Sequence, residues 1–203
     1  MEADWGPVMN SRDQVLADVR RALAGAERSP VTVPRGYRRT PAADVDMFAE
    51  KVADYRAVVV RCTADEAEQR IADALPQGAR VLVPDGLPWS VDGAVTDTGL
   101  TSSDLDSVDA VVTGATVGIA TTGTIVLSHG AGEGRRALTL VPDMHVCVVR
   151  ADQVVADVPD AVAVLDPTRP TTWISGPSAT SDIELDRVEG VHGPRTLHVI
   201  VVG

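Results

Sequence analysis

Aromatic residues, cysteines and long apolar runs are all scarce in this sequence, and each scarcity excludes a class of protein or site. Only 3% of the 203 residues are aromatic, so the core must consist of Val, Ala, Leu and Ile, which is typical of α/β proteins with buried parallel strands. Cys62 and Cys147 each belong to an apolar run and stand far apart. We therefore expect buried structural thiols, with no iron–sulfur cluster or zinc on this chain alone, and the sequence identifies no metal site or cofactor.

The chain also lacks the features of a membrane or nucleic-acid partner. No apolar stretch reaches the ~18 residues that a membrane-spanning helix needs, and the first residues lack the basic segment of a signal peptide. A net charge of -11 repels phosphate backbones and anionic lipid surfaces. We expect a cytoplasmic protein that binds neither nucleic acid nor membrane.

The composition divides the chain into an N-terminal helical arm with a linker, residues 1–41, and an α/β domain, residues 42–203. Ser11 and Gln14 form a capping box that predicts a helix, and the stretch 25–41 is rich in Pro, Gly, Arg and Thr. The sequence leaves open whether this helix packs on its own domain or on another subunit of a homo-oligomer.

Short apolar runs predict the strands of the domain, at 57–61, 80–84, 108–113, 125–128, 145–150, 170–174 and 196–202. Helices are expected at 45–55, 63–75 and 157–165, where Thr63 and Asp157 supply capping side chains. Strands that alternate with helices indicate a mainly parallel sheet, and we expect the segments 170–174 and 196–202 to be buried strands of it.

Most closely spaced polar groups of the C-terminal third lie between these last two strands. Ser175, Gly176 and Ser178 form a loop that offers hydrogen-bond donors, and Ser181 with Glu184 predicts a helix that begins near Asp182. His192 and Arg195 stand on a Gly-Pro turn before the last strand. We predict that His192, Arg195, Asp182 and Glu184 form a catalytic group at the carboxyl edge of the sheet, in which Arg195 clamps a carboxylate and His192 acts as acid or base. The alternative is a structural network that braces two loops.

Two further segments are candidates for anion binding. The glycine-rich stretch 130–134 before Arg135 and Arg136 predicts an anion-binding nest, although it matches neither a dinucleotide fingerprint nor a P-loop. The turn of Thr122, Gly123 and Thr124 suits either an oxyanion or a hairpin. Trp89 either lines a site or packs on the surface. His145, at the start of a predicted strand, is interpreted as a structural histidine.

Several of these segments together resemble the lactate utilization protein C family, the LUD-domain proteins. The combination of Ser-Gly-Pro-Ser, Asp-Ile-Glu and His-Gly-Pro-Arg is the most specific part of the resemblance. The matching stretches are 111–115, 119–124, 140–149, 174–184 and 190–199.

The resemblance implies a three-layer α/β/α sandwich of the NagB/RpiA/CoA-transferase-like kind. It also implies a cytoplasmic system that oxidises L-lactate to pyruvate, in which two partner proteins carry iron–sulfur centres. Family members often have a carboxylate where this chain has Thr121, which argues against covalent acyl transfer here.

Three functions follow as hypotheses. The first is a component of lactate oxidation that binds a small carboxylate or an anionic cofactor. The second, by analogy of fold, is a transferase or isomerase that binds CoA or a phosphorylated ligand. The third is an assembly or regulatory subunit without catalysis.

Overall fold

The computed structural model describes residues 10–34, 36, 42–180, 188–190 and 192–203. The chain divides into two units, residues 1–37 and residues 38–203. The first unit contains helix α1, Ser11–Ala22, none of whose residues is buried. The helix begins at the predicted residue, but its cap is Asn10, whose Oδ1 accepts a hydrogen bond of 2.9 Å from the backbone nitrogen of Asp13.

The second unit is built on a six-stranded sheet in which every pair of neighbouring strands is parallel. The central strands β12 (Thr196–Val202), β7 (Met144–Arg150) and β4 (Ala110–Thr113) are almost continuously apolar and buried on both faces, as parallel strands between two layers should be. The predicted parallel sheet is thereby confirmed. In spatial order its strands are β1 (Val58–Cys62), β12 (Thr196–Val202), β7 (Met144–Arg150), β4 (Ala110–Thr113), β2 (Val81–Val83) and β3 (Val95–Thr96).

A second sheet has four strands and mixed pairing. Its order is β8 (Val154–Val155), β5 (Val117–Ile119), β6 (Thr124–Leu127) and β9 (Thr172–Ile174). The prediction that residues 170–174 join the parallel sheet is wrong, because β9 pairs antiparallel with β6. Its central residue Trp173 is 41% exposed, so this strand has one solvent-facing side, which antiparallel edge strands tolerate. A short antiparallel ladder joins β10 (Ala179–Thr180) to β11 (Val188–Glu189).

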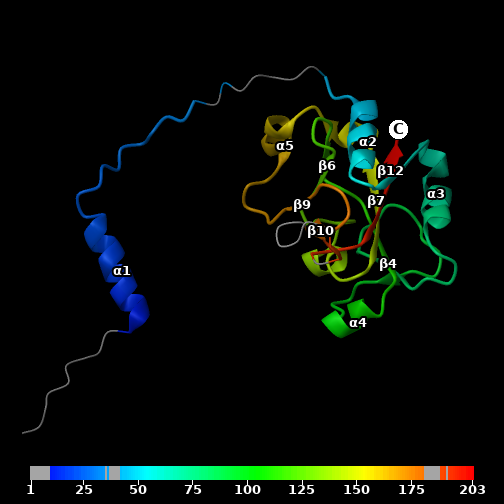
Figure 1. Ribbon diagram of the computed structural model, residues 1–203, viewed down its shortest axis with the longest axis horizontal. Coiled ribbons are helices and arrows are strands. Elements are labelled where there is room, and N and C mark those ends of the chain that lie inside the picture. The colour runs from blue at the N-terminus through cyan, green and yellow to red at the C-terminus, as the bar shows by residue number, and fades with distance from the viewer. Residues whose placement is uncertain (1–9, 35, 37–41, 181–187, 191) are drawn as a thin grey trace, which may run out of the picture. The chain divides into compact units, whose positions relative to one another are not determined.

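The helices of the second unit lie around these sheets (Figure 1). Helix α3, Ala67–Ala74, packs its buried Ile71 on one face of the parallel sheet, after the 3-10 helix η1, Ala64–Glu66. Helix α2, Val45–Asp54, and the four-stranded sheet together cover the other face. Helix α5, Val158–Val164, covers the outer side of the small sheet. The layer opposite α3 therefore contains strands as well as helix, which the predicted α/β/α sandwich did not include.

Short helical turns connect several of the strands. Helix α4, Ser102–Asp106, and the 3-10 helix η2, Arg136–Thr139, pack together over Leu82 and Val111. The 3-10 helix η3, Ala151–Gln153, follows β7 directly. Among the helices of the described residues, none is long and apolar enough to cross a membrane.

Candidate functional site

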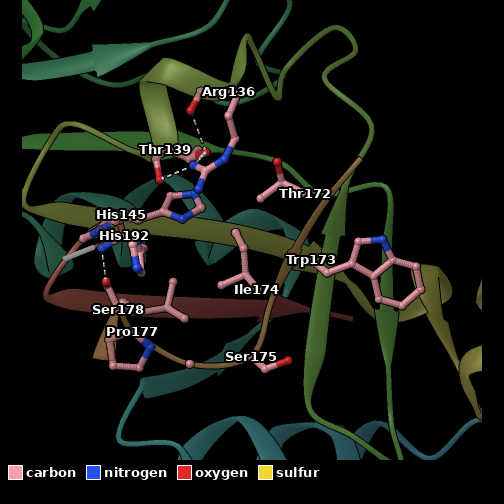
Figure 2. Close-up of a pocket in the computed structure, with 14 residues that line it drawn as sticks. Arg136, Thr139, His145, Thr172, Trp173, Ile174, Ser175, Pro177, Ser178 and His192 are labelled. Atoms are coloured by element: carbon pink, nitrogen blue, oxygen red, sulfur yellow. Dashed lines mark hydrogen bonds between the residues drawn. The ribbon is translucent and has the colours of Figure 1, made fainter. Parts of the chain in front are cut away.

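The segments singled out in the C-terminal third line a small cavity of about 120 Å³ (Figure 2). It lies where the loop after β9 meets the turn before β12 and the helical turn η2. Its described lining residues are Arg136, Thr139, His145, Thr172, Trp173, Ile174, Ser175, Gly176, Pro177, Ser178, His192, Gly193, Pro194 and Leu197. We call it the Arg136 cavity.

The Arg136 cavity lies at the amino-terminal edge of the parallel sheet. His145 and Leu197 are the second residues of β7 and β12 and are register partners, and Pro194 precedes β12. The predicted position at the carboxyl edge is therefore wrong. The reason is that the His192–Arg195 turn leads into its strand instead of leaving it, while the preceding strand β9 belongs to the other sheet.

Arg136 supplies the cationic group of the cavity. It opens η2, and its Nη1 donates to the carbonyl oxygen of Thr139 at 3.0 Å and to Thr139 Oγ1 at 3.3 Å. Burial lowers the pKa of the guanidinium from its ordinary value, yet arginine stays charged at neutral pH. The ion pairs found within the described ranges include none with Arg136. Its remaining N–H donors suit a carboxylate ligand.

His145 forms the inner wall beside Arg136 (Figure 2). Its side chain is 1% exposed, and Nε2 shares a 2.8 Å hydrogen bond with Thr113 Oγ1. Burial, and then the charge of Arg136, lower the pKa of His145 to about 4. The imidazole is consequently neutral at pH 7. Sequence reasoning described it as structural and missed its place in the cavity, although a histidine inside an otherwise apolar strand was a usable signal.

The loop of Ser175, Gly176 and Ser178 borders the cavity on the other side. Ser178 Oγ accepts a 2.9 Å hydrogen bond from the backbone nitrogen of His192, and Ser178 N donates to the carbonyl oxygen of Pro194 at 2.9 Å. Gly176 has φ +86°, and a Cβ there would lie 2.5 Å from Tyr55 Cβ, so only glycine fits. The structure thus brings together five of the predicted residues around one cavity: Arg136, Ser175, Gly176, Ser178 and His192.

The predicted residues of the 122–124 turn lie just behind this loop. They form the hairpin between β5 and β6, as one of the two interpretations had it. Thr122 Oγ1 donates to Thr124 Oγ1 at 2.8 Å, and Thr124 Oγ1 lies 2.8 Å from Ser175 Oγ. Gly123 packs on the backbone of α2. These residues support the cavity and do not line it.

The remaining predicted residues take other positions or fall outside the description. Arg195 Nε donates to Asp143 Oδ1 at 2.6 Å, and Arg195 is not among the residues that line the cavity. Arg135 forms two hydrogen bonds to Asp97, of 2.8 and 3.0 Å, and these hold the pKa of that carboxyl below its usual range. Asp182, Glu184 and the capping box predicted for them lie outside the described residues.

The predicted anion nest of residues 130–134 does not form. The backbone nitrogens of Glu133 and Gly134 both donate to the carbonyl oxygen of Gly130, and Gly132 N donates to Asp85 O. An anion would need those N–H groups. Glu133 is also buried, at 7% exposure, and its carboxylate repels an anion from this loop.

Comparison with known proteins identifies the family. Residues 94–202, more than half of the chain, match the LUD domain family. The chain belongs to the LUD-domain family. It is 46% identical to a lactate utilization protein C of Deinococcus radiodurans over 94% of each protein, and 37% identical to that of Bacillus pumilus over 41% of this chain and 38% of the relative. The predicted resemblance is thereby confirmed.

A solved structure agrees with this assignment. The crystal structure of a DUF162 family protein from Deinococcus radiodurans has a TM-score of 0.68 and 43% sequence identity with this LUD-domain protein. The match covers 78% of this chain and 96% of the other. At this identity, the likeness supports both the α/β fold and the family.

Two further observations on this LUD-domain protein concern Thr121 and the two cysteines. Thr121 donates its hydroxyl to Asp157 Oδ1 at 2.9 Å, so a carboxylate from the start of α5 lies next to this position. Cys62 and Cys147 are free and buried, and burial raises the pKa of the Cys147 thiol to about 12. Neither thiol is placed as a nucleophile. No group of three or more His, Cys, Asp or Glu residues suited to a metal ion occurs among the described residues.

Proposed function

We propose that this LUD-domain protein is a component of an L-lactate utilization system and binds a small carboxylate, lactate or pyruvate, in the Arg136 cavity. The single observation that carries the proposal is a guanidinium, without an ion-pair partner among the described residues, that lines a small, partly open cavity. The name of the relative that is 46% identical over 94% of the chain, lactate utilization protein C, points to the same class of substrate.

The lining residues suit a short hydroxy acid. Arg136 would bind the carboxylate, since a guanidinium presents paired N–H donors in the plane of two carboxylate oxygens. The hydroxyl of Ser178 and the imidazole of His192 would bind the ligand's hydroxyl or keto oxygen, whereas the Ser175 hydroxyl contacts Thr124 behind the loop. Arg136 thereby takes the clamping role predicted for Arg195, which is engaged with Asp143.

The size of the cavity favours this ligand over CoA or a nucleotide. At about 120 Å³ it is well below the roughly 300–1,000 Å³ typical of sites that bury a drug-sized molecule. Arg135, which would help to hold a phosphate, is already bound to Asp97. The observations thus support the carboxylate hypothesis and give the phosphorylated-ligand hypothesis no specific contact.

Oxidation of lactate to pyruvate releases two electrons and two protons, and other proteins of the system would accept the electrons. The two buried thiols of this chain are poor ligands for an iron–sulfur cluster, because such clusters need several cysteines at close spacing. As the family resemblance implies, we assign the iron–sulfur centres to two partner proteins. In this division of labour, the present chain binds and positions the acid.

Titration calorimetry with L-lactate tests the ligand. Arg136→Gln should weaken binding at least tenfold, because a charge-assisted hydrogen bond to a carboxylate is worth about 1.5–3 kcal/mol. Arg135→Gln is the matched control, since it removes the same charge from the neighbouring residue outside the cavity, and its affinity should stay within about twofold of the wild-type value. Equal affinity in the wild-type and Arg136→Gln proteins would refute this role for Arg136.

A further inference from the structure

A second and larger cavity, of about 380 Å³, lies at the opposite edge of the parallel sheet. Gly86 follows β2, Gly114 follows β4, and Arg150 is the last residue of β7, so the cavity lies where these strands end. In open α/β sheets this carboxyl edge is where ligands usually bind. Its volume also falls within the range of sites for small organic molecules. We call it the Glu133 cavity.

Glu133 is the buried charged group in the wall of this cavity, whereas Arg150, which also lines it, is half-exposed and paired with Asp152. Glu133 is 7% exposed. Its Oε1 accepts a hydrogen bond of 2.6 Å from Thr116 Oγ1, and its Oε2 accepts one of 2.6 Å from the backbone nitrogen of Ser128. Both donors are neutral, and the ion pairs of the described part of the chain include none with Glu133. A buried carboxylate without a cationic partner is costly to keep.

The rest of the wall combines an aromatic ring with glycine backbone. Trp89 lies over Gly114, where a Cβ would be 3.8 Å from Trp89 Cζ3. Gly86 and Gly132 allow their two loops to meet: a Cβ on Gly132 would lie 3.1 Å from Gly86 O, and both have φ near +75°. Two segments singled out in the sequence, Trp89 and the glycine-rich loop, therefore meet in one cavity.

We propose that the Glu133 cavity is a second ligand site, for an organic molecule with a flat apolar part and an amino, amidino or hydroxyl donor. The flat part would stack on Trp89. The donor would bind Glu133, because an ionised carboxylate only accepts hydrogen bonds and each oxygen has a further lone pair beyond its protein partner. This selectivity is opposite to that of the Arg136 cavity, which takes anions. The second site is therefore independent of the lactate proposal.

Glu133→Gln removes the charge and preserves the internal hydrogen bonds. The amide oxygen can accept from Ser128 N, and the amide nitrogen can donate to Thr116 Oγ1, which is able to accept because a hydroxyl does both. Glu68→Gln is the matched control. Glu68 Oε1 likewise accepts from a backbone nitrogen, that of Ser90 at 2.8 Å, but Glu68 lies outside the Glu133 cavity.

Benzamidine, a flat ring with a cationic donor group, is the probe. Binding to the full chain is followed by the chemical shifts of the tryptophan indole N–H groups in NMR, with Trp89→Phe to assign the Trp89 signal. We expect saturable binding with shifts at Trp89, at least tenfold weaker affinity in Glu133→Gln, and unchanged affinity in Glu68→Gln. Thermal midpoints of both variants should stay close to that of the wild type. Absence of binding, or equal affinity in the wild-type and Glu133→Gln proteins, would overturn the proposal.

Discussion

Replacing Gly123 with alanine should lower the free energy of unfolding by about 3 kcal/mol or more. Gly123 has φ +58°, and a Cβ there would lie 2.5 Å from the carbonyl carbon of Lys51 and 2.7 Å from the backbone nitrogen of Val52. These atoms belong to the last turns of α2. The clash can therefore be relieved only by moving this helix, whose Val52 and Phe48 are fully buried. The hairpin that carries Thr124 would then shift relative to Ser175, and the Arg136 cavity with it.

Gly93→Ala separates this clash from backbone strain. Gly93 has φ +69°, but a Cβ there would have nothing within 4 Å. It should cost only the strain of a left-handed alanine, about 1 kcal/mol. Urea unfolding of both variants gives the two free energies. Equal losses of unfolding free energy in the two variants would mean that α2 shifts at little cost and that the close contact at Gly123 does not contribute to the loss.

Stability should fall by about 3 kcal/mol between pH 6.5 and pH 4 because of His145. Its pKa is about 4 in the folded protein and 6.5 for the ordinary group. Between these two pH values His145 binds a proton in the unfolded chain but not in the folded one, so acidification favours unfolding. The stabilisation is fully present above pH 6.5, declines as the pH falls toward 4, and changes no further below that value from this group.

His145→Gln isolates this contribution. A glutamine amide nitrogen can take the place of Nε2 beside Thr113 and does not titrate. The difference in unfolding free energy between wild type and variant should therefore change with pH between 6.5 and 4, and should be constant above 6.5. His198, whose pKa burial also lowers, titrates in both proteins and cancels in the difference. Parallel pH profiles for the two proteins would show that His145 is not held neutral by burial.

Local signals predicted the elements that depend on local chemistry. The apolar run 196–202 coincides with β12, and the capping side chain of Asp157 marks the start of α5, where its Oδ1 accepts from Val158 N at 2.8 Å. The capping box of Thr63 and Glu66 also forms. In each case the determining contacts lie within a few residues of one another. The family, likewise, could be identified from short motifs.

Contacts between distant residues could not be predicted in this way. Arg135 and Arg136 are neighbours in sequence, and only the fold shows that the first binds Asp97 while the second lines a cavity. The sheet to which β9 belongs depends on its pairing with β6, some 50 residues earlier. The same pairing decided which edge of the parallel sheet the C-terminal loops occupy. Glu133 was not singled out, because its burial depends on Thr116 and on the loop after β2.

Reconstitution of lactate oxidation tests the central claim most directly. The chain is combined without oxygen with the two proposed iron–sulfur partner proteins, and L-lactate-dependent reduction of a dye is followed. We predict that turnover requires this chain, falls at least tenfold with Arg136→Gln, and stays near the wild-type rate with Arg135→Gln. Equal turnover with the chain left out would contradict the account, and would place lactate binding and oxidation wholly in the partner proteins.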